Sequence, residues 1–226
     1  MKPVISHPWD LSQNEALLLQ QKLATKVVRE DKFGDIQLIA GVDVAYEKEG
    51  DKLVAAVVIL DADTLNIVET ATATDVAQFP YIPGLFSFRE LPPLILAMSK
   101  LEHQPDLIVC DGQGIAHPRR LGLASHLGVI FDMPTIGCGK TKLIGQHDTP
   151  DIKRGAVTPL IDKDEVIGSV LRTQQGINPI YVSIGNQISL STANEWVLKL
   201  SPKYRLPETT RSADQAVRVK LSKITS

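Results

Sequence analysis

The chain has 226 residues, of which 43% are hydrophobic and 22% are charged; this composition supports a buried core and excludes a disordered protein. The net charge of −2 excludes a protein that binds nucleic acid through overall positive charge, so any such binding must use local basic patches. The longest apolar run, Leu53 to Leu60, is far shorter than the roughly 20 residues that span a bilayer, and the N-terminal segment lacks the apolar stretch of a signal peptide. We therefore expect a cytoplasmic monomer without a membrane span, folded as one domain over residues 1–226.

The first part of the chain predicts a helix followed by three strands. Ser12 and Glu15 form a capping-box pattern, and apolar residues at helical spacing continue to about Arg29. Strand-like segments follow at 36–46, 52–60 and 66–74, separated by the short turn sequences KEGD and DADT. Because connections this short join neighbouring antiparallel strands, we expect a meander.

The second part alternates helices and strands. The pattern predicts a helix over 86–101, a strand over 107–110, a helix over 119–127 and a strand over 135–138, an order that implies parallel crossovers. Further strand signals at 155–159, 165–172 and 179–184 precede a helix around residues 193–200, and a last helix follows PETTR. We therefore predict an α/β fold of the ribonuclease-H-like class: a mixed sheet, with an antiparallel meander and then parallel β-α-β units, covered by helices on both faces.

The two cysteines, Cys110 and Cys138, lie in apolar, strand-like segments without CxxC spacing. This pattern favours reduced thiols in the core over zinc or redox chemistry.

Four acidic residues stand at positions that favour chemistry. Asp43 lies in the otherwise apolar segment IAGVDVAY, where an unpaired carboxylate carries a large desolvation cost. Asp111 ends LIVCD and precedes GQG, which places it at the carboxyl edge of a strand, where α/β sheets build their sites. Glu90 lies near a helix start, and Asp214 lies on the final helix. If the fold brings these carboxylates together, their repulsion requires a cation, and oxygen ligands favour Mg²⁺ or Mn²⁺ over zinc.

Each of these acids also has an ordinary structural interpretation. A single strand aspartate is more often a turn cap or a buried hydrogen-bond acceptor than a metal ligand. The residues alone therefore predict a candidate site for a divalent cation and leave its use open.

Five segments together resemble the endonuclease V family. They are GVDVAY at 41–46, PYIPGLFSFRE at 80–90, DGQGIAHPRRLGLASHLGV at 111–129, GCGKTKL at 137–143 and YRLPETTRSADQA at 204–216. The resemblance covers nearly the whole chain, and it depends on the order and spacing of all five segments, because a string such as DGQG alone is common.

The resemblance implies a Mg²⁺-dependent site in which Mn²⁺ can substitute. Asp43, Glu90 and Asp111 match the metal-binding carboxylates, and Asp214 matches a position near the metal. Lys140 matches an active-site lysine that holds a phosphate oxygen or stabilises the attacking water; its ordinary interpretation is a solvated loop lysine.

The resemblance also implies how a damaged base is recognised. The loop of Pro80, Tyr81, Ile82 and Pro83 resembles the family's wedge, in which two prolines stiffen the loop and the tyrosine fills the space left by the flipped base. Without the resemblance, this tyrosine would be interpreted as a packed turn residue. Another group of residues matches the family's hypoxanthine pocket, where backbone approaches the base closely: Gly84, Gly112 and Gly122.

Basic residues beside the acids are candidates for contacts with the phosphates of a bound strand. They are His117, Arg119, Arg120 and Lys142. Taken singly, each is more often a solvent-facing residue than a DNA contact.

The resemblance implies a DNA repair endonuclease that hydrolyses the second phosphodiester bond 3′ to a deoxyinosine, leaving a 3′-hydroxyl and a 5′-phosphate. Two alternatives stay open. In the first, the substrate is RNA that contains inosine; the sequence does not decide between RNA and DNA, because contacts to a 2′-hydroxyl are not visible in a sequence. In the second, the protein binds lesions without catalysis. The intact set of acidic residues argues against a non-catalytic protein.

Overall fold

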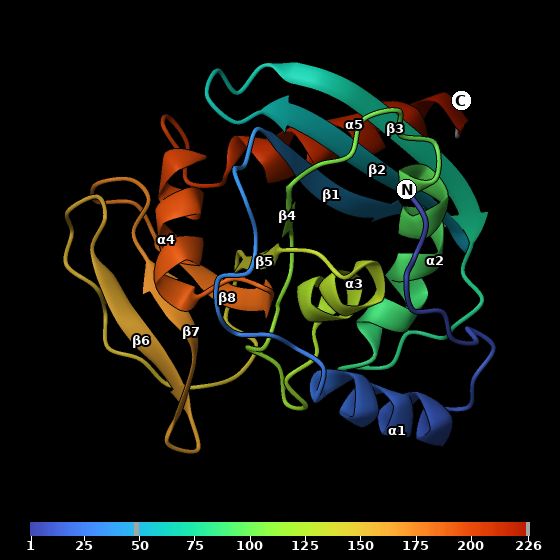
Figure 1. Cartoon of the computed structure of the whole chain (residues 1–226), viewed down its shortest axis with the longest axis horizontal. Helices are drawn as coiled ribbons and strands as arrows, with labels where there is room; N and C mark the ends of the chain where they lie inside the picture. Colours follow the sequence, from blue (N-terminus) through green and yellow to red (C-terminus); the bar gives the residue numbers. More distant parts are fainter. Residues whose placement is uncertain (48–49, 225–226) are drawn as a thin grey trace.

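The computed structural model describes residues 1–47 and 50–224. In this part of the chain, five helices pack around one eight-stranded sheet with the strand order β3-β2-β1-β4-β5-β8-β7-β6 (Figure 1). The strands are β1 (Leu38–Tyr46), β2 (Lys52–Asp61), β3 (Ile67–Val76), β4 (Leu107–Cys110), β5 (Thr135–Gly139), β6 (Val157–Asp162), β7 (Glu165–Leu171) and β8 (Ile180–Asn186). The helices are α1 (Gln13–Ala24), α2 (Phe86–Met98), α3 (Leu123–Phe131), α4 (Leu190–Lys199) and α5 (Glu208–Ile224).

The sheet is mixed, as predicted. β1, β2 and β3 form the antiparallel meander, and β4 lies parallel to both β1 and β5. Because α3 joins β4 to β5, these elements form a parallel β-α-β unit. The last three strands extend the sheet in antiparallel fashion, β8 on β5, β7 on β8 and β6 on β7. The predicted ribonuclease-H-like arrangement is confirmed.

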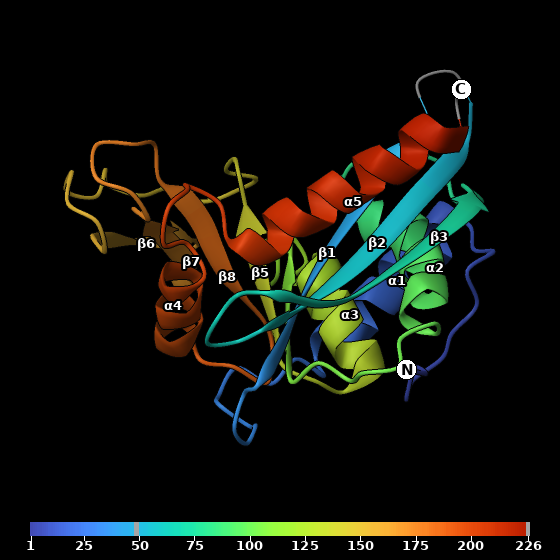
Figure 2. The ribbon, with the colours of Figure 1, turned by 90° about the horizontal axis from the view of Figure 1, so that it is seen from above.

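Helices cover both faces of the sheet (Figure 2). On one face, α2 and α3 pack against the alternate residues Ala40 and Val42 of β1, and α1 packs outside these two helices. On the other face, α4 packs on the central strands, and α5 packs on β2 through Val217 and Ala213. Coverage on both faces explains why β2 is a continuous apolar run rather than an alternating one.

Two helices differ in their bounds from the sequence prediction for a clear physical reason. α1 ends at Ala24 rather than near Arg29, because the chain beyond it is held by the end of β8: the Val28 N–H donates to Asn186 Oδ1 at 3.0 Å. The helix expected from Arg119 begins only at Leu123, since Arg120 adopts a left-handed φ of 57° and breaks the helical path.

Smaller differences concern two other helices. α2 ends at Met98 rather than near residue 101, and α5 begins at Glu208, inside the PETTR segment rather than after it. The turn sequence KEGD includes residues 48–49, which lie outside the described residues.

Both cysteines are free and buried, as predicted. Within residues 1–47 and 50–224, no helix combines the length and apolarity that a membrane span requires.

Candidate active site

Two aspartates lie close together in the middle of the sheet, where β4 ends beside the parallel strand β1. Val42 of β1 pairs with Cys110, the last residue of β4. The residues that follow them, Asp43 and Asp111, therefore lie side by side at the carboxyl end of β4. Sequence reasoning placed Asp111 at such an edge, and the parallel register explains why Asp43 joins it.

Helix α5 brings Asp214 to the same place through a close approach to β1. A Cβ atom at Gly41 would lie 2.0 Å from the backbone oxygen of Thr209, so only glycine allows α5 to pack this near the strand. The charge of Asp214 then acts on Asp43. Glu90 arrives from the opposite face, on α2, and is 4% exposed.

The carboxylates repel one another strongly. Burial, together with the negative charges of Asp111 and Asp214, raises the pKa of Asp43 to about 7. Burial and the charges of Asp43 and Asp111 also raise the pKa of Glu90 well above its usual range, although the Tyr46 hydroxyl donates to Glu90 Oε1 at 3.0 Å and works in the opposite direction. The cluster therefore favours a proton or a cation between its members.

Two basic side chains balance part of this charge. Lys140 Nζ contacts Asp111 Oδ2; although partial burial opposes it, this contact and the charges of Asp43 and Asp214 raise the pKa of Lys140, so the amine stays protonated. Arg218 Nε lies 2.9 Å from Asp214 Oδ2 on the same helix. The sequence prediction included Lys140 and missed Arg218, which stands four residues after an acid on a helix, a spacing typical of an ion pair.

The donor set fits a hard divalent cation, because its oxygens carry charge that the protein balances only in part. Within residues 1–47 and 50–224, however, no three His, Cys, Asp or Glu side chains are grouped so as to hold a metal ion as they stand. The fold thus brings the four predicted acids within electrostatic reach, and their role as ligands stays a prediction.

The predicted wedge and pocket residues meet at a cavity of about 300 Å³, a small ligand pocket. Asp111 forms part of its wall, which connects the cavity directly to the carboxylates. Its lining also includes Tyr81, Ile82, Pro83, Gly84, Gly112 and Gly122. Tyr81 is 69% exposed and meets the Phe86 ring edge to face, and Pro80 precedes it in the same exposed loop.

Glycine is required at two of these positions. Gly84 has a φ of +78°, which side-chain-bearing residues rarely adopt. A Cβ at Gly122 would lie 2.3 Å from the backbone oxygen of Gln113, so glycine allows two backbone segments of the cavity wall to touch.

A buried glutamine ties the walls of the cavity together. Gln20 of α1 is 1% exposed, and its Nε2 donates to the carbonyls of Leu121 at 2.8 Å and Gly84 at 3.0 Å. Its Oε1 accepts from Arg119 Nε, and Arg119 Nη2 donates to the Gly84 carbonyl at 2.7 Å. The wedge loop and the loop before α3 are therefore fixed to each other by one network.

Sequence reasoning missed Gln20, although a signal was present. Gln20 follows Ala16 by four residues and precedes Leu23 by three, so it occupies the apolar stripe of α1. A polar residue in such a stripe must find buried partners.

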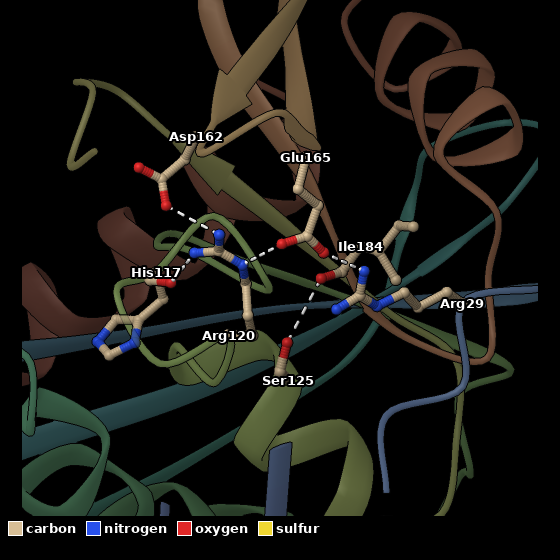
Figure 3. Close-up of polar contacts among 7 residues, drawn as sticks. All are labelled: Arg29, His117, Arg120, Ser125, Asp162, Glu165 and Ile184. Atoms are coloured by element: carbon tan, nitrogen blue, oxygen red, sulfur yellow. Dashed lines mark hydrogen bonds and ion pairs between the residues drawn. The ribbon is translucent and has the colours of Figure 1, made fainter. Parts of the chain in front are cut away.

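Three of the four predicted phosphate contacts are engaged within the protein. Burial and the nearby Arg119 and Arg120 lower the pKa of His117 to about 4, so this buried imidazole is neutral at pH 7. Arg120 Nη2 lies 2.8 Å from Asp162 Oδ2, and its Nε lies 2.7 Å from Glu165 Oε2 (Figure 3). Arg119 holds the Gly84 carbonyl, as described above. Arg120 is thus paired with two acids of the β6–β7 hairpin, whereas the guanidinium of Arg119 is held by neutral oxygens. The role of these three residues as phosphate contacts stays a prediction.

Lys142 differs from these three, because it is exposed and lines the cavity. The loop that carries it is tied to the Asp111 loop, since Gln113 Nε2 donates to the carbonyl of Thr141 at 3.1 Å. Lys142 is therefore an exposed positive charge at the cavity, and its role as a phosphate contact stays a prediction.

Known proteins resemble this chain along most of its length. The profile of the endonuclease V family matches residues 21–215. An endonuclease V from Trichormus variabilis is 51% identical over 210 residues, which are 92% of this chain and 95% of the relative. The crystal structure of the endonuclease V from Streptomyces avermitilis has a TM-score of 0.93 and 44% identity, with 98% of both chains covered.

A more distant relative was crystallised with nucleic acid. The endonuclease V of Ciona intestinalis, 29% identical with a TM-score of 0.82, covers 93% of this chain and 98% of its own. It was solved in complex with a 24-mer DNA that contains an inosine followed by a ribo-adenosine. Given a family profile that spans residues 21–215 and relatives near 50% identity over nearly the whole sequence, this chain belongs to the endonuclease V family of nucleases.

Proposed function

We propose that this protein nicks DNA strands that contain deoxyinosine, by hydrolysis of the second phosphodiester bond 3′ to the lesion, with Mg²⁺ or, in its place, Mn²⁺ as cofactor. The products are a 3′-hydroxyl and a 5′-phosphate. The observation that carries the proposal is the shared wall: Asp111 belongs both to the carboxylate cluster and to the cavity bordered by the Tyr81 loop. A base held in the cavity therefore places its own strand beside the acids.

The acidic residues prepare the hydrolytic site. Asp43, Glu90, Asp111 and Asp214 would hold the divalent cation, which supplies Lewis-acid activation of the phosphate and of water when it is bound. Lys140, protonated and in contact with Asp111, offers a point charge to a phosphate oxygen. Lys142, exposed beside the cavity, neutralises a neighbouring phosphate.

The loop from Pro80 to Pro83 would act as the wedge. The exposed Tyr81 ring is available to stack in the gap that a flipped nucleotide leaves, and two prolines reduce the entropy lost when the loop binds. The flipped base would enter the cavity at Gly84, Gly112 and Gly122, where backbone comes close to its edges.

A second candidate substrate is RNA that contains inosine. The Ciona intestinalis relative was crystallised with a strand in which a ribonucleotide follows the inosine. This observation favours testing matched DNA and RNA strands side by side.

The test is a Mg²⁺-dependent nicking assay on end-labelled strands, one with inosine and one without. Wild-type protein should cut only the inosine strand, at the second bond 3′ to the lesion, and EDTA should stop the reaction. Asp43→Ala and Asp111→Ala should abolish nicking while the circular dichroism spectrum is unchanged. Asp63→Ala is the matched control, because this aspartate is 90% exposed and pairs with Lys199 away from the cluster.

Undiminished nicking by either cluster variant would refute the assignment. Tight binding of the inosine strand by the wild type without any nicking would identify a lesion-binding protein instead. Faster cleavage of the RNA strand than of the DNA strand would select the second candidate.

A further inference from the structure

A chain of hydrogen bonds, buried at its inner end and exposed at its outer end, leads from the cavity to the N-terminal segment. Ser87, in the first turn of α2, lines the cavity and is 3% exposed. Its Oγ lies 2.9 Å from Nδ1 of His126, a fully buried residue of α3. Nε2 of His126 lies 2.8 Å from Nε2 of His7, whose Nδ1 lies 2.8 Å from the backbone oxygen of Pro8.

The proton positions along these hydrogen bonds follow from the outermost bond, between His7 and the Pro8 carbonyl. A backbone carbonyl only accepts, so Nδ1 of His7 carries a proton. A neutral His7 then has a bare Nε2, which accepts from the Nε2–H of His126. A neutral His126 has a bare Nδ1, which accepts from the hydroxyl of Ser87. Both imidazoles are neutral because burial lowers the pKa of each.

The direction of these hydrogen bonds determines whether Ser87 offers a ligand a hydrogen-bond donor or an acceptor. A serine hydroxyl has one proton and two lone pairs, and the proton is committed to His126. We propose that Ser87 is a specificity-determining residue, which accepts a hydrogen bond from a ring N–H of the bound base, and that His126 and His7 are positioning residues that orient its hydroxyl. The inference rests on the proposed function, because it names a residue that would recognise the base held in the cavity.

An acceptor at Ser87 separates a deaminated purine from its parent. Hypoxanthine carries a proton on N1 at neutral pH, whereas adenine has a bare N1 that is itself an acceptor. Deamination of adenine thus turns this edge from acceptor to donor, and only the product matches Ser87. A mismatch places two acceptors together in a buried site, where an unmade hydrogen bond is costly. Guanine also has N1–H, so this contact does not exclude it.

The proton positions are measurable without any enzymatic activity. The ¹⁵N chemical shifts of the histidine rings in the labelled full-length protein should show His126 protonated on Nε2 and bare on Nδ1, and His7 protonated on Nδ1. A proton on Nδ1 of His126 would overturn the proposal, because Ser87 would then be the acceptor of that proton and a donor to the cavity.

Base selectivity is tested with two strands that differ only at the lesion. One contains hypoxanthine, and the other contains unsubstituted purine, whose N1 is bare. Ser87→Ala should lower kcat/KM on the hypoxanthine strand about tenfold, the size of one hydrogen bond, and should not lower kcat/KM on the purine strand, where one of two facing acceptors is removed. Equal losses on both strands would show a merely structural role and would overturn the proposal.

Variants at His7 test the orienting chain at a distance from the base. His7→Phe keeps a ring beside Trp9, which lies 4.2 Å away between centroids, but removes the acceptor for His126, so the hypoxanthine preference should fall. His7→Gln supplies a side-chain oxygen in its place and should restore the preference. A preference unchanged in His7→Phe would remove His7 from the chain of positioning residues.

Ser125→Ala is the matched control, since it removes another buried α3 hydroxyl, one that donates to the Ile184 carbonyl at 3.4 Å (Figure 3). Its preference should equal that of the wild type. A wild-type protein that nicks neither strand would refute the proposed function and, with it, the reading of a base by Ser87; the ¹⁵N result would still decide the proton positions.

Discussion

Asp43→Asn should make the metal-free protein more stable at pH 8 while abolishing its nicking activity. In the wild type, burial and the charges of Asp111 and Asp214 raise the pKa of Asp43 from 3.8 to about 7. The carboxylate is therefore held in the folded state at a cost, and asparagine keeps the shape without the charge. The Val44 N–H, which bonds the carboxylate, can still bond the amide oxygen.

The sign and size of the effect follow from proton linkage. Asp43 binds its proton more tightly in the folded protein than in an unfolded chain, so the free energy of unfolding falls as the pH rises from about 4 to about 7 and stays low above that range. Between pH 5 and pH 8 the linkage relation gives a loss of about 2–3 kcal/mol for this one group. This figure is an upper bound, because water near the partly exposed site screens the repulsion.

Urea unfolding in EDTA at pH 5 and pH 8 measures the difference. Asp43→Asn should gain stability over the wild type mainly at pH 8, and Asp63→Asn, at an exposed position, should behave as the wild type at both. Addition of Mg²⁺ should raise the unfolding midpoint of the wild type more than that of Asp43→Asn. If Asp43→Asn were destabilised more at pH 8 than at pH 5, the carboxylate would be a net stabilising group and the argument from repulsion would be wrong.

Three further predictions concern the cavity. Tyr81→Ala should raise KM for the inosine strand with little change in kcat, since lost stacking costs about 1–3 kcal/mol; a pure loss of kcat would contradict a wedge. Gly84→Ala should lower the free energy of unfolding in urea by about 1–2 kcal/mol, because of its positive φ and a new contact 2.6 Å from Arg119 Nη2; no loss would show that the loop relaxes. Gln20→Leu should lower the free energy of unfolding by about 1–3 kcal/mol and raise KM, because the Leu121 carbonyl loses its donor and Arg119 Nε loses its acceptor; an unchanged KM would show that this network does not affect substrate recognition.

In the proposed function, recognition of the base and hydrolysis of its strand would both depend on one short loop, residues 111–113. Asp111 faces the carboxylate cluster and the cavity, and Gly112 and Gln113 continue the same wall. A substitution in this loop should therefore alter both base selectivity and the rate of hydrolysis, whereas a substitution at Tyr81 should alter substrate recognition more than the rate of hydrolysis.

The sequence by itself was sufficient to predict the helices and strands and to name the four acidic candidate residues. Local patterns depend on neighbours in the chain, so the capping box at Ser12, the short turns of the meander and the apolar strand before Asp111 all indicated their structures directly. The five ordered motifs identified the family, and the family profile confirmed it. Helix bounds were less accurate where distant residues decide, as at Val28, which bonds Asn186 rather than continuing α1.

Only the tertiary structure decided which side chains are free to act. His117, Arg119 and Arg120 read as basic residues beside an acidic site, yet long-range partners such as Gln20, Asp162 and Glu165 engage the two arginines, and burial leaves the histidine neutral. Ser87 and His126 lie within two of the quoted motifs, but the sequence did not single them out, because the hydrogen bonds that connect them to each other and to His7 join residues up to 119 positions apart. Charge, protonation and hydrogen-bond direction depend on burial and on partners in space, and a linear pattern contains neither.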